Sequence, residues 1–150
     1  MKNQYFGNIN DYRKYGLLRV LSAAGGISTG VCWLLTPSDG RTDGQSLTYL
    51  DQPLRYRHFD PYLFDHLFRC LKVEGERDVR LVESTDILPG TSFHEPILSD
   101  FANEWRRYFA EMLESFRGVE LVFLDPDNGL EVSSRDSDAR TRVSTFTGIS

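Results

Sequence analysis

The sequence has few of the residues that form disulfides or bind structural metals. Its 150 residues include two cysteines and three histidines, with no CxxC motif and no Cys/His cluster. This scarcity argues against a structural zinc site. Cys32 lies in an apolar run and Cys70 in a helix-like run, which favours two buried free thiols over a disulfide.

Long apolar runs are also missing. No segment approaches the roughly 20 apolar residues that span a bilayer, and the opening MKNQY lacks the apolar stretch of a signal peptide. We therefore expect no membrane association and a cytoplasmic location. The net charge of −5 does not predict attraction of the whole chain to nucleic acid, but local arginine patches keep nucleic acid among the candidate partners. The sequence does not indicate an oligomeric state.

What the chain does contain is enough apolar material for one packed domain. Hydrophobic residues make up 40% of the chain and aromatic residues 13%, values typical of globular proteins. We assign residues 1–132 to a single α/β domain. Residues 133–150 are rich in Ser, Thr, Arg and Asp with little apolar periodicity, which is typical of a polar flexible tail.

Hydrophobic periodicity predicts alternating helices and strands. Asn10 is the expected N-cap of the first helix, and Asp60-Pro61 the start of the second. A loop carrying Pro89, Gly90 and Pro96 is expected before the third helix. This order is typical of a three-layer, Rossmann-like, mostly parallel sheet; three strands are few for such a domain, which suggests a truncated one. The expected helices cover 11–24, 60–75 and 100–116, and the expected strands 31–36, 79–83 and 119–124.

Polar side chains follow each predicted strand. Asp39 and Asp43 follow the first, Glu83 ends the second, and 125–129 (DPDNG) follows the third. Ligands of open parallel sheets bind beyond the carboxyl ends of the strands, so we expect these side chains to converge on one crevice. Asp, Pro, Asn and Gly are also good turn formers, and the alternative is that 125–129 is only a turn.

Three functions fit these residues. Carboxylates at Asp39, Asp125 and Asp127 suit Mg²⁺ and would indicate a phosphoesterase or nuclease. One carboxylate could instead hold an amino group and orient it towards a methyl donor. The third alternative is a non-catalytic binding module whose acidic turn docks a basic partner.

The strand 121–124 followed by Asp125-Pro126 resembles the motif of Rossmann-fold methyltransferases that act on amino groups. Their pattern is Asp or Asn, Pro, Pro and an aromatic; Asp127 and Asn128 occupy the last two places here. The resemblance implies S-adenosylmethionine as cofactor. It places Asp125, Asp127 and Asn128 in the catalytic motif, with Asp39, Gly40 and Glu83 near the cofactor.

The opening segment 5–15 (YFGNINDYRKY) is similar to the start of some bacterial ribosomal-RNA adenine methyltransferases, which implies that Lys14 approaches the cofactor or the substrate. This opening, together with the DPDNGLE segment at 125–131, is also similar to an uncharacterised bacterial and phage family. That second resemblance implies no activity.

Overall fold

The fold is built around a small parallel sheet. A computed structural model describes residues 1–41, 46–99 and 101–126. Within this part, strands β1 (Thr29–Cys32), β2 (Thr91–His94) and β3 (Leu121–Leu124) form a three-stranded sheet in the order β2-β1-β3. Both pairings are parallel, with Cys32 opposite His94 on one side and Leu124 on the other. The predicted α/β class is confirmed.

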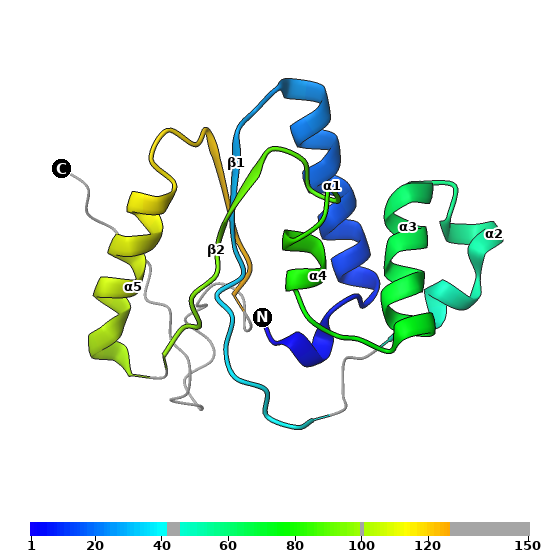
Figure 1. Ribbon diagram of the computed structural model, residues 1–150, viewed down its shortest axis with the longest axis horizontal. Helices are drawn as coiled ribbons and strands as arrows, with labels where there is room; N and C mark the ends of the chain where they lie inside the picture. The colour runs from blue at the N-terminus through cyan, green and yellow to red at the C-terminus, as the bar shows by residue number, and fades with distance from the viewer. Residues whose placement is uncertain (42–45, 100, 127–150) are drawn as a thin grey trace, which may run out of the picture.

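Helices cover both faces of the sheet. Helix α5 (Ala102–Ser115) lies on one face, and α1 (Ile9–Gly25) and α4 (Arg80–Glu83) lie on the other (Figure 1). Helices α2 (Pro53–Tyr56) and α3 (Pro61–Phe68) lie outside α1 (Figure 1). The short elements are η1 (Asn3–Tyr5), η2 (Thr48–Asp51) and the π-helical η3 (Arg69–Glu74). None of the described helices is long and apolar enough to cross a membrane.

The two faces of β1 and of the residues that follow it belong to two apolar clusters. Val31 and Trp33 pack into the larger cluster with α1, α3 and α4. Cys32 and Leu34 pack into the smaller cluster with α5. This segment is buried on both sides, which explains its unbroken apolar sequence. Cys32 and Cys70 are both buried and free, as predicted.

The helix starts are set by side-chain caps. Helix α1 is capped by Asn8, whose Oδ1 accepts from the backbone N–H of Asn10 at 2.7 Å and of Asp11 at 3.1 Å. The expected cap at Asn10 is therefore wrong by two residues. The expected cap at Asp60 is confirmed, because its carboxylate accepts from the Leu63 N–H at 3.0 Å.

The predicted middle strand is wrong. Residues 80–83 form helix α4, because the Asp78 carboxylate accepts from the Arg80 N–H at 2.9 Å and starts a turn. Val79 and Val82, three residues apart, are both buried on one side of that turn. The true second strand is β2, inside the segment expected to be a loop.

The remaining strands are shorter than predicted or displaced along the chain. The first was expected at 31–36 and lies at Thr29–Cys32, and the last was expected at 119–124 and lies at Leu121–Leu124. The predicted tail at 133–150 lies outside the described residues, as does the turn beyond Pro126.

We expect Gly30→Ala to destabilise the fold, because a Cβ at this position would lie 2.8 Å from Cδ1 of Phe116. Overpacking of this kind costs about 1–3 kcal/mol, against about 0.4–1 kcal/mol gained from a stiffer unfolded chain. Urea denaturation of the parent chain and of Gly30→Ala measures the net change in the free energy of unfolding. In a Phe116→Leu background the penalty should shrink; an equal penalty in both backgrounds would show that the Phe116 ring does not pack against Gly30.

Candidate functional site

A pocket lies at the carboxyl ends of β1 and β3. The chain passes from β1 to β2 on the α1 side of the sheet and from β2 to β3 through α5 on the other side (Figure 1). The connections that leave the carboxyl ends of β1 and β2 therefore run to opposite faces of the sheet, and ligands of open parallel sheets bind beyond the carboxyl ends of the strands. The pocket of about 420 Å³ includes Ser46 from the segment after β1, and Asp125 and Pro126 after β3.

The N-terminal segment and the start of α1 form most of the pocket wall. This segment is held from several sides: the Met1 nitrogen donates to the carbonyls of Trp33 at 3.1 Å and Asp125 at 3.2 Å, and the Tyr49 hydroxyl donates to the Gly7 carbonyl at 2.9 Å. The wall residues from this part are Met1, Tyr5, Asn8, Ile9, Asn10, Asp11 and Lys14.

One ammonium group joins two carboxylates in this wall. Lys14 Nζ lies 2.8 Å from Asp11 Oδ1 and 2.6 Å from Asp125 Oδ2. The other oxygen of Asp11 accepts from the Gly7 N–H at 2.8 Å. The first turns of α1, the end of β3 and the N-terminal segment are thus joined through three charged side chains.

Burial and the neighbouring charges shift the pKa values of the side chains in this network. The side chain of Asp11 is almost completely buried, and this desolvation raises its pKa although Lys14 opposes the shift. Burial alone would lower the pKa of Lys14, but the charges of Asp11 and Asp125 outweigh it and the net pKa is raised. Lys14 is therefore an ammonium at neutral pH, and Asp11 binds a proton at a higher pH than an exposed aspartate does.

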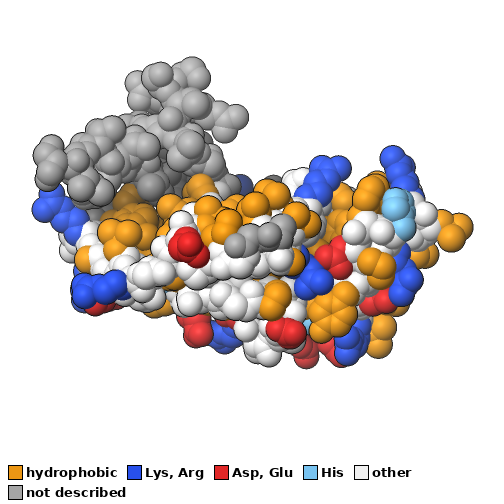
Figure 2. All heavy atoms as spheres, turned by 90° about the horizontal axis from the view of Figure 1, so that it is seen from above, with side chains coloured by type: hydrophobic (Ala, Val, Ile, Leu, Met, Phe, Trp, Pro, Cys, Tyr) orange, Lys and Arg blue, Asp and Glu red, His pale blue; other side chains and the backbone are white. Residues whose placement is uncertain are grey.

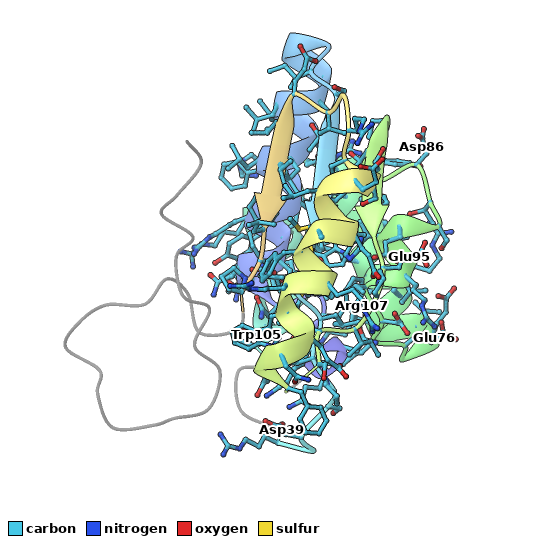
Figure 3. The ribbon with its side chains drawn as sticks, turned by 90° about the vertical axis from the view of Figure 1, so that its left-hand side faces the viewer. Asp39, Glu76, Asp86, Glu95, Trp105 and Arg107 are labelled. Atoms are coloured by element: carbon cyan, nitrogen blue, oxygen red, sulfur yellow. The ribbon has the colours of Figure 1, made fainter. Side chains whose placement is uncertain are left out.

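Of the residues predicted near a cofactor, only Lys14 lines this pocket. Asp39 lies at the lower end of the molecule in Figure 3, where its carboxylate accepts from Lys2 Nζ at 2.8 Å and Gln4 Nε2 at 2.7 Å. The bond from Lys2 lowers the pKa of Asp39. Gly40 has a φ of 72°, with open space around it.

Glu83 is not at the end of a strand, which corrects the sequence prediction. It belongs to α4, and its carboxylate accepts from the indole Nε1 of Trp33 at 2.8 Å. Burial raises the pKa of Glu83, while the bond from Trp33 opposes the rise. Its position is explained by this contact with the core.

The predicted catalytic residues are described only in part. Asp125 lines the pocket, whereas Asp127 and Asn128 lie outside the described residues. Sequence reasoning missed Asp11 and Asn8. The available signal was the spacing Asp11–Lys14, which places opposite charges on one side of a helix.

Comparison with known proteins adds no relative. No family model matches the sequence, and no significant match exists among curated proteins or solved structures. The function is therefore argued from the pocket and its charges.

We expect Lys14→Met to destabilise the fold by about 2–3 kcal/mol at neutral pH, because it leaves two facing carboxylates unpaired, one of them buried. Removal of the ammonium raises the pKa of Asp11 further above its unfolded value. The folded chain then binds more protons than the unfolded chain between the two pKa values, so its stability falls as the pH rises through that window.

Urea denaturation of Lys14→Met and of the parent chain at pH 5 and pH 8 tests this expectation. The loss of unfolding free energy in Lys14→Met should be larger at pH 8 than at pH 5. Lys72→Met, which removes an exposed pair with Asp51, is the control and should cost less than about 1 kcal/mol at both values. A deficit for Lys14→Met that does not change with pH would contradict the charge argument.

Proposed function

We propose that this chain is a methyltransferase-like protein that uses S-adenosylmethionine and acts on an amino group held by Asp125. One observation carries the proposal: inside the pocket, the Asp125 carboxylate already accepts a hydrogen bond from an N–H of the Lys14 ammonium, with Nζ at 2.6 Å. An acceptor amine bound in the same place would make the same contact.

The position of Asp125 supports the proposal. It follows β3, which pairs directly with the central strand β1, and it lies at the edge where ligands of parallel sheets bind. Asp125-Pro126 are also the residues that resemble the methyltransferase motif. The sheet edge and the motif thus favour the same residue.

The pocket offers charged and polar groups to a cofactor. The carboxylates of Asp11 and Asp125 are balanced by Lys14 and by the N-terminal ammonium of Met1, and Asn8 and Asn10 add amide groups to the wall. The volume of about 420 Å³ lies in the roughly 300–1,000 Å³ range of small-molecule sites. Asp39, Gly40 and Glu83 are not among the lining residues, so we assign the cofactor contacts to Asn8, Asn10 and Asp11 instead.

Lys14 and its two carboxylates have separate tasks in this proposal. The acceptor amine displaces Lys14 Nζ from Asp125, and Asp11, at 2.8 Å, retains the ammonium. Asp125 then accepts an N–H of the acceptor and orients the nitrogen lone pair, so that orientation supplies much of the rate. The same carboxylate is placed to take the proton that the nitrogen loses on methylation. S-adenosylmethionine, when bound, supplies a methyl group on a positively charged sulfur.

The acceptor best suited to this site is a neutral amine. An aliphatic ammonium has no lone pair until it loses a proton, and Asp125 would stabilise the charged form. An exocyclic amino group of a nucleobase is neutral and has N–H groups to donate, which makes nucleic acid our proposed substrate class.

Two further proposals accompany this function. We propose that the described sheet belongs to a three-layer Rossmann-like domain, because helices cover both of its faces (Figure 1). We also propose a cytoplasmic location, since both cysteines are free thiols.

We expect S-adenosylmethionine to raise the melting temperature. At about 100 times its dissociation constant a ligand stabilises the folded state by about 2.7 kcal/mol, or roughly 5–10 °C for a chain of this size. Differential scanning calorimetry measures the shift, with ATP as a control ligand that shares the adenosine. A shift with ATP equal to that with S-adenosylmethionine, or no shift with either, would contradict the proposal.

Asp125→Asn should separate binding from reaction. We expect it to retain most of the thermal shift but to reduce methyl transfer to mixed single-stranded oligonucleotides by at least about 100-fold, as expected for a positioning contact. Asp39→Asn, at the same edge but outside the pocket lining, should transfer methyl groups at the parental rate.

A Mg²⁺-dependent phosphoesterase is the second candidate, favoured by the two carboxylate oxygens that share Lys14 Nζ at 2.8 and 2.6 Å. In the part of the chain that is described, no group of three or more Asp, Glu, His or Cys is placed to hold a metal, and Asp39 is bonded to Lys2 instead. Nucleic-acid cleavage abolished by chelation would favour this candidate. The third alternative is a non-catalytic module that binds a basic partner. Binding of such a partner that weakens with salt, without any turnover, would favour it.

A further inference from the structure

The turn between α2 and α3 exposes several large apolar and basic side chains. Leu54 is 99% exposed, Phe59 71% and Tyr62 56%, and Arg55, Arg57 and His58 are also exposed. Figure 2 shows hydrophobic, basic and histidine side chains together at the end of the molecule that carries α2 and α3. We call these six residues the 54–62 surface.

Hydrogen bonds hold the backbone under this surface in place. The Tyr12 hydroxyl donates to the Tyr56 carbonyl at 2.9 Å, and both nitrogens of the Arg57 fork donate to Asp65 at 2.7 and 2.6 Å. Tyr56 itself packs against the main core cluster. Leu54 and Phe59 are therefore exposed on a turn that these hydrogen bonds hold in place, and apolar groups that are exposed together are candidates for an interaction site.

The charge around the 54–62 surface is positive although the whole chain has a net charge of −5. The neighbouring acids Asp51, Asp60 and Asp65 are paired with Lys72, Arg19 and Arg57. Among the described residues, Arg55 and Arg69 form no such pair. Two guanidinium groups thus stay available for an anionic partner.

Aromatic and guanidinium groups lie close together at this turn. The ring centroids of His58 and Phe59 are 4.0 Å apart, and the two rings are tilted by 36°. The Arg55 guanidinium lies 5.2 Å from the centroid of the Tyr56 ring, and the Arg19 guanidinium lies 5.2 Å from that of Tyr62. Aromatic rings and guanidinium planes are the surfaces on which unpaired bases stack.

We propose that the 54–62 surface binds single-stranded nucleic acid, with Phe59 stacking on a base and Arg55 contacting a phosphate. The surface supplies both parts of such a site, exposed aromatic rings at Phe59 and Tyr62 and a guanidinium group at Arg55 with no ion pair among the described residues. This binding does not depend on the methyl-transfer proposal, because none of the six residues lines the pocket.

Fluorescence anisotropy with labelled mixed-sequence 15-nucleotide DNA and RNA tests the proposal in the absence of S-adenosylmethionine. Phe59→Leu keeps an apolar side chain but removes the ring, and we expect it to weaken binding by about tenfold. Arg55→Gln should reduce the slope of log K against log salt by about 0.7, the value for one lost phosphate contact on a single strand.

Matched controls are available on the opposite side of the sheet. Phe101 is exposed near the start of α5, and Arg107, labelled in Figure 3, is exposed on α5. Phe101→Leu and Arg107→Gln should leave binding within about twofold of the parent. Circular dichroism and melting temperatures verify that all four variants are folded.

Four outcomes would overturn the proposal. They are the absence of oligonucleotide binding, equal losses in the control variants, full binding by Phe59→Leu, and binding of inorganic polyphosphate as tight as that of the oligonucleotides. Sedimentation with vesicles of phosphatidylglycerol and phosphatidylcholine that is lost in Leu54→Ser, without oligonucleotide binding, would assign the surface to membranes instead.

Discussion

The contact of one lysine with two aspartates is the interaction on which the candidate site depends. Lys14 Nζ lies within 2.8 Å of Asp11 and 2.6 Å of Asp125, and it joins positions that are 111 residues apart in the chain. Without the ammonium, two carboxylates would face each other beside a partly buried pocket. With it, attraction offsets the cost of burying Asp11.

The walls of the pocket follow from this contact. Asp11 also accepts from the Gly7 N–H, so the same carboxylate that binds Lys14 fixes the turn before α1. The Met1 nitrogen adds bonds to carbonyls beyond β1 and β3. The N-terminal segment is therefore attached to the carboxyl edge of the sheet, beyond β1 and β3. The proposed reaction uses the same network, since an acceptor amine would replace Lys14 at Asp125.

Sequence patterns predicted the parts of the fold that depend on burial and local caps. The helix beginning at Asp60-Pro61, the α5 region and the strand before Asp125 all follow from periodicity or capping. β2 could not be found this way, because Thr91-Ser92-Phe93-His94 contains one large apolar residue and is half-exposed. The segment Val79–Glu83 was wrongly predicted to be a strand, because two valines three residues apart fit a short strand as well as a helical turn. At the site, Asp125 was predicted from its strand, whereas Asp11 required knowledge of how α1 lies against β3.

A double-mutant cycle between Lys14 and Asp125 tests most directly whether this contact holds the site together. The free energies of unfolding of the parent, Lys14→Met, Asp125→Asn and the double variant give the coupling between the two side chains. Residues in one charged network couple by about 0.5–3 kcal/mol, and we predict a coupling above about 1 kcal/mol at pH 7. Additive losses, with coupling below about 0.5 kcal/mol, would contradict the account.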